Sequence, residues 1–410
     1  MGKMVGKSLQ ESRLLWHIAF PAILTAVFQF SIGFVTVGFV GHIGEVELAA
    51  VTVVENVIEG FAYGVLLGMG SALETLCGQA VGAGQVDMLG IYIQRSWIIC
   101  GATALVLAPT YVFAAPILRA LHQPAAMSAV AGRYTRWVVP QLFAYAANFP
   151  LQKFFQAQSK VWAMTFISGV VLALHVVLNY VFVTRLGHGL FGAAMIGNVT
   201  WWIIILAQFA YLVSGCFPEA WKGFSMLAFS NLAAFVRLSL ASAVMLCLEL
   251  WYYTAVLILV GLLKNAQLEV DIMSVCINYQ LWTLMVALGF NAAVSVRVSN
   301  ELGANRPKAA RFSVIMAVST SAAIGAVFLA VFLAWRTELP RFFSDNEEVV
   351  SEAAKLGYLL AATIFLNSIQ PVLSGTCGDR SRVADACCHH KHWVLLLGWH
   401  PTGGPLWLQA

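Results

Sequence analysis

Ionisable side chains are scarce in this sequence of 410 residues, because Asp, Glu, Lys and Arg together make up only 10% of it. A water-soluble domain carries about 25% of such residues. Hydrophobic residues account for 60% of the chain, which leaves too few charged side chains to cover the surface of a soluble fold. We therefore exclude a water-soluble globular protein and expect an integral membrane protein.

Motifs that would indicate other functions are also absent. No HExxH, GxSxG or paired-aspartate motif lies in an apolar segment, so we do not expect a membrane-embedded enzyme. The net charge of +4 is modest and spread over loops, which does not indicate nucleic-acid binding. Five cysteines lie in or beside apolar segments without forming a CxxC pair, and we interpret them as buried, reduced residues rather than a metal site: Cys77, Cys100, Cys216, Cys247 and Cys276.

Apolar segments recur at lengths near 20 residues, which is enough to cross a bilayer as an α-helix. A transmembrane β-barrel would instead show short segments of alternating polarity. Lys and Arg are more frequent in the loops on the side of the N-terminus, so we place the N-terminus in the cytosol. We predict an all-α membrane protein with about ten spans, at about 14–37, 48–78, 89–115, 130–151, 161–183, 191–213, 234–261, 270–298, 311–335 and 350–375.

The sequence contains an internal repeat with a constant offset of 221 residues. This offset aligns 68–73 with 289–294, 81–84 with 302–305, and Pro150 with Pro371. The second copy begins after six spans, so both copies enter the membrane from the same side. Parallel repeats of this kind are typical of transporters whose substrate site lies between two lobes. We expect an N-lobe at 1–213, a cytosolic inter-lobe loop at 214–232 and an incomplete C-lobe of four helices at 233–375.

Six stretches carry a resemblance to a known family. The most specific is GMGSALETLCGQAVGAG at 68–84, and the others are GHIGEVELA at 41–49, QRSW at 94–97, CLELWYY at 247–253, VSNELGA at 298–304 and NSIQPVLSG at 367–375. On these stretches the chain resembles plant-type MATE (multidrug and toxin extrusion, or DETOXIFICATION) transporters from about residue 10 to 375. The resemblance implies a two-lobed bundle of twelve helices that exchanges organic solutes for protons.

The same resemblance implies the function and its partners. We expect export of organic solutes and xenobiotics, flavonoid-like or alkaloid-like, from the cytosol across the vacuolar membrane or the plasma membrane. We expect no cofactor besides the proton gradient, and we expect a monomer in the lipid bilayer that binds a small organic solute and protons. Some family members conduct small anions, so a passive anion channel on the same fold is an alternative, as is a non-functional truncated product.

Glu249 lies in the middle of the seventh predicted span, with no basic residue one turn away. An ionisable side chain inside a span is costly and indicates function by default, and the resemblance implies a C-lobe proton site at this position. The resemblance also implies an Asp partner on the tenth span, but this sequence has Asn367 there, and Asn cannot titrate. Coupling therefore rests on Glu249 with Asn278 as a hydrogen-bond partner, or the protein is more channel-like. The alternative is that Glu249 and Asn278 only join helices.

Glu55 and Glu59 are one helical turn apart, so they share a face of the second predicted span. Two acids on one face cannot comfortably meet lipid, and we expect them to face the central cavity and attract a cationic substrate. The alternative for Glu55 is simple solvation near the membrane interface. We assign Tyr252, in the CLELWYY stretch, to the same substrate cavity.

The remaining candidates belong to the family stretches and are interpreted as structural. Glu74 is expected to form a hydrogen bond between the end of its helix and a neighbouring loop. Gln79 lies in the same stretch. Gly82 and Gly303 end the two equivalent helices of the repeat, where glycine permits a left-handed cap. No Walker lysine follows either glycine, so we expect no phosphate site.

The resemblance stops after Gly375. The segment 376–410 contains CCHHKH at 387–392, which could suggest a zinc site, but a simpler interpretation is translation out of frame. Shifted by one nucleotide, the segment is compatible with an eleventh helix of the family. We therefore predict an out-of-frame tail at 376–410 on a chain that lacks the family's eleventh and twelfth helices.

Overall fold

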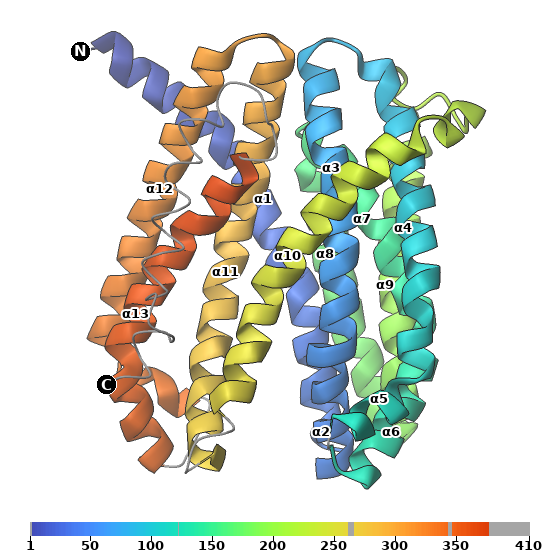
Figure 1. Ribbon diagram of the computed structural model, residues 1–410, viewed down its shortest axis with the longest axis vertical. Coiled ribbons are helices and arrows are strands. Elements are labelled where there is room, and N and C mark those ends of the chain that lie inside the picture. The colour runs from blue at the N-terminus through green and yellow to red at the C-terminus, as the bar shows by residue number, and fades with distance from the viewer. Residues whose placement is uncertain (1, 122, 261–265, 343–346, 377–410) are drawn as a thin grey trace. The chain divides into compact units, whose positions relative to one another are not determined.

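The computed structural model describes residues 2–121, 123–260, 266–342 and 347–376, and it describes side chains at 6–121, 123–248, 272–341 and 350–373. The described residues form helices and connecting loops, with no β-strand among them (Figure 1). The expected all-α architecture is confirmed. The predicted tail at 376–410 lies outside the described residues from 377 onward.

Every predicted span coincides with helical structure. The α-helices are α1 (Gly2–Val40), α2 (Glu45–Val53), α3 (Gly60–Gly82), α4 (Leu89–Val112), α5 (Ala114–Ala120), α6 (Ala125–Trp137), α7 (Val139–Ala157), α8 (Val161–Asn179), α9 (Gly189–Val213), α10 (Leu232–Val260), α11 (Ala266–Gly303), α12 (Pro307–Ala334) and α13 (Glu347–Thr376). Two π-helical segments, Val54–Glu59 and Tyr180–Arg185, continue α2 and α8, and single 3₁₀ turns occur at Val86–Met88, Met226–Phe229 and Leu339–Phe342.

The fourth predicted span is interrupted. The segment 130–151 falls on α6 and α7, which meet at Val138, and Pro140 occupies the first turn of α7. Proline has no backbone N–H to donate to the preceding turn, so it fits the start of a helix better than its interior. A hydropathy window of about 20 residues does not locate such a break, because it averages over both helices.

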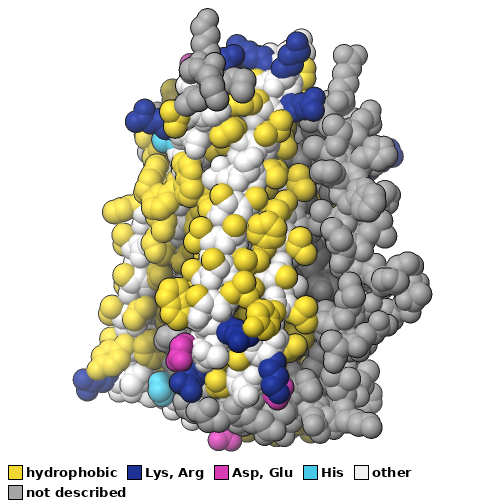
Figure 2. Space-filling view, turned by 90° about the vertical axis from the view of Figure 1, so that its left-hand side faces the viewer, with side chains coloured by type: hydrophobic (Ala, Val, Ile, Leu, Met, Phe, Trp, Pro, Cys, Tyr) yellow, Lys and Arg dark blue, Asp and Glu magenta, His cyan; other side chains and the backbone are white. Residues whose placement is uncertain are grey.

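Among the described residues, eight helical segments are long and apolar enough to cross a membrane. They are Gly6–Val40, Glu45–Gly82, Val86–Val112, Val161–Arg185, Gly189–Val213, Ile272–Gly303, Pro307–Ala334 and Val350–Leu373. Figure 2 shows that hydrophobic side chains dominate the middle of the described part of the face that it presents, while Lys and Arg gather toward its two ends. This distribution fits a bilayer around the helices, and the chain is a multi-pass membrane protein.

The helices cluster in two compact units, which are Met1–Ile23 with Tyr252–Ala410 (unit 1) and Leu24–Trp251 (unit 2). In unit 1, α11, α12 and α13 pack on one another, and Trp16 of α1 meets Phe290 of α11 edge to face at 5.0 Å. In unit 2, α7 packs against α3, α4 and α9. The predicted division into lobes at 1–213 and 233–375 stays a prediction.

In unit 2, the second part of α1 is held against α8 by buried polar side chains. Hydrogen bonds join Thr25 to Thr165 at 2.9 Å and Gln29 to Ser168 at 3.4 Å. Inside the membrane such interhelical hydrogen bonds fix the register of two helices. The spacing of the two α1 residues by four places both on one helix face.

The internal repeat is visible in the way two helices end. α3 ends at Gly82 and α11 at Gly303, and in each case the residue two positions later has a left-handed backbone, with φ of 74° at Gly84 and 58° at Asn305. In both caps the next N–H donates to a carbonyl five residues earlier at 2.8 Å, from Gln85 to Ala80 and from Arg306 to Glu301. This is the Schellman pattern. The two caps are 221 residues apart, as the sequence offset predicts.

The repeat also explains two glycines. In unit 2, a Cβ atom at Gly68 of α3 would collide with the backbone of Ala243 in α10. In unit 1, a Cβ atom at Gly289 of α11 would collide with Ile23 of α1. Gly289 is the repeat equivalent of Gly68, so each copy uses glycine at the same position to let another helix approach closely.

Candidate functional site

Two acidic residues lie in the π-helical segment between α2 and α3. Glu55 and Glu59 belong to Val54–Glu59, and the N–H of Gly60 donates to the carbonyl of Glu55, five residues earlier. Glu59 is buried, with 7% of its surface exposed, and Glu55 is half-buried. Turns of this type are rare and occur frequently at functional sites, which sets these two acids apart from the others in the chain.

The Glu59 carboxylate is bound on one side only. Its Oε2 atom accepts a hydrogen bond from the Tyr145 hydroxyl at 3.4 Å and another from the Gln141 amide at 3.3 Å. Gln141 also donates to the Tyr145 hydroxyl, so the three side chains form one network between the π-helical segment and α7. The Oε1 atom of Glu59 is buried and has no hydrogen-bond partner among the residues that the structure describes. A buried charged oxygen without a partner is costly, so this atom is available to a proton or a ligand.

Aromatic rings surround this network. Tyr145 meets Tyr63 edge to face at 5.5 Å and Trp201 at 4.7 Å, and Tyr63 also meets Phe149 at 4.9 Å. Tyr and Trp combine a flat apolar surface with a polar group, and their ring faces attract cations. Beside the Glu59 carboxylate these rings pack edge to face on one another.

The second acid contacts a different helix. A Cβ atom at Gly33 of α1 would lie 3.5 Å from a carboxyl oxygen of Glu55, which is an ordinary van der Waals distance, so the Glu55 carboxylate lies against α1. Among the described residues, no ion pair includes Glu55 or Glu59. The expectation that Glu55 and Glu59 face a central cavity and attract a cationic substrate stays a prediction.

Glu74 has a partner that the sequence did not indicate. Its carboxylate pairs with Lys153 of α7 at 2.5 Å, and the two side chains are 9% and 13% exposed. The partner is therefore a charged residue on another helix rather than a neighbouring loop. Gln79 is half-buried on the same helix, and Gly82 is its last residue.

The candidates of the predicted C-lobe are described in part. Glu249 and Tyr252 lie on α10, but their side chains lie outside the described residues. Asn278 of α11 is half-buried, and its amide donates to the Ser274 carbonyl of its own helix at 2.9 Å. Asn367 is half-buried on α13. The predicted proton site that combines Glu249, Asn278 and Asn367 therefore stays a prediction.

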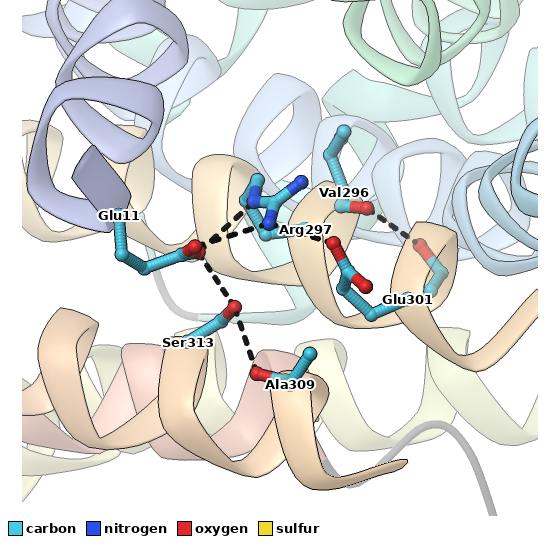
Figure 3. Close-up of polar contacts among 7 residues, drawn as sticks. Glu11, Val296, Arg297, Glu301, Ala309 and Ser313 are labelled. Carbon is cyan, nitrogen blue, oxygen red and sulfur yellow. Dashed lines mark hydrogen bonds and ion pairs between the residues drawn. The ribbon is translucent and has the colours of Figure 1, made fainter. Parts of the chain in front are cut away.

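A charged cluster in unit 1 was not expected from the sequence (Figure 3). The Arg297 guanidinium of α11 donates to both carboxyl oxygens of Glu11 in α1, at 3.0 and 3.1 Å, and to Glu301 at 2.8 Å. Ser313 of α12 donates to Glu11 at 2.6 Å. The i,i+4 spacing of Arg297 and Glu301 could have predicted their ion pair. The contact with Glu11 could not be predicted in this way, because Glu11 is 286 residues from Arg297 in sequence.

A second buried polar group that sequence reasoning missed surrounds His175 of α8. Its ring nitrogens lie 3.0 Å from the Thr36 hydroxyl and 2.8 Å from the Thr200 hydroxyl, and the Asn179 amide is 3.0 Å from the same nitrogen as Thr36. These bonds join α1, α8 and α9. Within the described residues, His, Cys, Asp and Glu form no group of three or more that could hold a metal ion.

Comparison with known proteins assigns a family to this arrangement. A family model described as MatE matches residues 21–181 and 241–384, which is more than half of the chain. Protein DETOXIFICATION 33 of Arabidopsis thaliana is 52% identical over 366 residues, which cover 89% of this chain and 76% of that protein. Protein DETOXIFICATION 29 of the same plant is 50% identical over 407 residues, or 97% of this chain and 81% of that protein.

Solved structures agree with this assignment. The crystal structure of the eukaryotic MATE transporter AtDTX14 matches with a TM-score of 0.88 and 30% identity, over 96% of this chain and 87% of that chain. The Vibrio cholerae MATE transporter VcmN in its bent form shares the fold, with a TM-score of 0.77 and 16% identity over 95% and 87% of the two chains. The chain therefore belongs to the MATE family of efflux transporters, with plant DETOXIFICATION proteins among its relatives.

Proposed function

We propose that this protein is an antiporter that exports an organic cation or a related solute from the cytosol in exchange for protons. The observation that carries this proposal is the buried Glu59 carboxylate, which within the described part of the chain has one unpartnered oxygen and no basic residue to neutralise it. An ionised carboxylate at membrane depth is unfavourable without a counter-charge. It therefore holds either a proton or the positive charge of a solute.

Competition between the proton and the solute for the Glu59 carboxylate couples their transport. A proton and a cationic solute cannot both neutralise one carboxylate, so binding of the one favours release of the other. Tyr145 and Gln141 remain hydrogen-bonded to Glu59 Oε2, which leaves Oε1 as the exchanging atom. The aromatic rings of Tyr63 and Trp201 beside Tyr145 favour flat aromatic solutes, which agrees with alkaloid-like and flavonoid-like substrates.

A second proton site at Glu249 is part of the same proposal. The support for this second site is that Glu249 is an isolated acid within an apolar helix. With Asn367 in place of a second carboxylate, Glu249 acts without an acidic partner on α13. We place the protein in the vacuolar membrane or the plasma membrane, where export from the cytosol into an acidic space uses the proton gradient.

Transport into proteoliposomes tests the proposal. The full chain is reconstituted in phosphatidylcholine vesicles with an acidic lumen, and uptake of the fluorescent aromatic cation ethidium is followed. Glu59→Gln keeps the shape and one hydrogen-bond acceptor but removes the charge. Loss of a charged partner costs about 1.5–3 kcal/mol, so uptake falls roughly ten- to hundredfold. Glu45→Gln at the exposed start of α2 is the matched control and retains uptake.

Two outcomes would contradict the proposal. Wild-type uptake by Glu59→Gln would remove the exchange role of this carboxylate. Ion currents that are independent of a pH gradient would favour the passive anion channel over an antiporter. Glu249→Gln is measured in the same assay, and it is expected to abolish the dependence of uptake on the pH gradient.

A further inference from the structure

The loop between α9 and α10 carries large apolar side chains on its surface. Phe224 is 76% exposed and Met226 is 84% exposed, and Leu227 and Phe229 follow with 60% and 62%. These four residues lie within six positions of each other. A cluster of exposed apolar side chains marks a surface that binds an apolar partner, because contact between apolar side chains and water is unfavourable.

The loop that carries these residues is held firmly by two side chains of α4. The Gln94 amide donates to the Gly223 carbonyl at 3.0 Å, and its oxygen accepts from the Ser225 N–H at 2.8 Å. The Arg95 guanidinium donates to the Leu227 carbonyl at 3.2 Å and to the Ser230 hydroxyl at 2.9 Å. The bonds from α4 thus fix the backbone before, within and after the apolar segment.

Aromatic packing fixes the start of the same segment. Trp221 meets Trp97 of α4 at 6.1 Å, Phe209 of α9 at 6.3 Å and Phe224 at 5.4 Å. Within the segment, Ala228 is 2% exposed and points the opposite way from its exposed neighbours. Contacts within the protein therefore hold the backbone of the loop in place. The backbone need not become ordered when the exposed side chains bind.

The position of the loop along α4 sets its depth. The 24 residues of α4 span about 36 Å at 1.5 Å per residue, which exceeds a hydrocarbon core of about 30 Å. Gln94 and Arg95 lie in the second turn of this helix, near its N-terminal end. In Figure 1 the loop, drawn in yellow-green, projects sideways from the end of unit 2 at which α3 and α4 join. It therefore lies level with the membrane surface.

We propose that residues 224–229 form a preordered membrane anchor, in which Phe224, Met226, Leu227 and Phe229 enter the boundary between lipid headgroups and acyl chains. The occupant is phospholipid because the loop follows α9, a span whose surface carries exposed apolar side chains such as Leu206. Val213 at the end of α9 is already 47% exposed. Lys222 is exposed beside the anchor, where a basic side chain reaches the headgroups. Aromatic residues favour this boundary.

Site-specific photocrosslinking tests the anchor in the complete protein. p-Benzoylphenylalanine is placed at Phe224 or at Phe229, the protein is reconstituted in phosphatidylcholine nanodiscs, and the illuminated sample is analysed by intact-mass spectrometry. The expected result is a mass increase of one phosphatidylcholine at both positions. The matched control carries the same probe at Glu219, an exposed residue of the same loop outside the apolar segment, and shows no lipid adduct.

The other outcomes would overturn the proposal. A crosslink from position 224 or 229 to a second copy of the chain would make the segment a dimer contact, and a crosslink to another segment of the chain would make it an internal packing surface. Absence of a lipid adduct, or equal adducts at position 219, would exclude a specific anchor. Arg95→Ala removes the α4 clamp without touching the apolar residues, and it is expected to lower the lipid adduct at position 224.

Discussion

The charged cluster of unit 1 predicts unequal effects for two substitutions that each break the same ion pair. Arg297 is shared by the carboxylates of Glu11 and Glu301. Arg297→Gln leaves both carboxylates without a counter-charge, although they are only 12% and 14% exposed. Removing one partner of a buried pair costs about 3–5 kcal/mol. Because some exposure remains, we expect a loss of about 3 kcal/mol in the free energy of unfolding.

The substitution on the other side of the pair is expected to be much milder. Glu11→Gln leaves Arg297 paired with Glu301 at 2.8 Å, and its amide oxygen can still accept from Ser313. The change therefore weakens hydrogen bonds without leaving a buried charge alone, at about 1 kcal/mol. The difference between the two variants, about 2 kcal/mol, is the cost of the uncompensated carboxylates.

Unfolding of the detergent-solubilised protein in sodium dodecyl sulfate, followed by circular dichroism, measures both values. Lys355→Gln is the control, because it breaks the Glu352–Lys355 pair at a position where the side chains are 42% and 68% exposed. An exposed pair contributes about 0–1 kcal/mol. Equal destabilisation by Glu11→Gln and Arg297→Gln would refute the reasoning, since it would mean that Glu301 does not compensate Arg297.

Three further predictions follow from unit 2. Gly68→Val places a side chain against the backbone of Ala243, so we expect lower thermal stability and less folded protein in size-exclusion chromatography, whereas Gly101→Val, with open space around it, is tolerated. Lys153→Met leaves the Glu74 carboxylate buried and unpaired, and we expect a loss of about 3 kcal/mol that Glu74→Gln in the same chain largely restores in the unfolding titration. The Gln141 amide nitrogen lies 3.3 Å from Glu59 Oε2, so Gln141→Lys places a fixed positive charge beside this carboxylate. We expect a folded protein that no longer binds ethidium in a fluorescence titration. Retained binding would show that the solute does not use this carboxylate.

The sequence predicted the helices well because hydropathy over about 20 residues depends only on local composition. It also predicted the repeat, whose equivalent caps at Gly84 and Asn305 have the same left-handed backbone. Hydropathy did not locate the break between α6 and α7 or the π-helical segment Val54–Glu59, because a window of about 20 residues averages over such local changes. The periodicity of an α-helix and that of one inserted π turn differ too little to be separated over six residues.

The partners of the acids could not be predicted for a different reason. Gln141 and Tyr145 reach Glu59 across 82 and 86 residues of sequence, and Lys153 reaches Glu74 across 79. No periodicity within one helix connects such residues, since the contact depends on how α3 packs against α7. The sequence could therefore identify which acids lie inside spans, but not which of them are neutralised.

That difference separates the structural acids from the functional ones. Glu74 and Glu11 each have a basic partner within 3.0 Å, so their charge is compensated permanently and gives the protein nothing to exchange. Glu55 and Glu59 have none among the described residues, and the Oε1 atom of Glu59 lacks even a hydrogen bond. A buried charge without a fixed partner requires a mobile one. In an antiporter the mobile partners are the proton and the solute, and for this reason our proposal places the exchange at Glu59 rather than at the better-connected acids of α1 and α3.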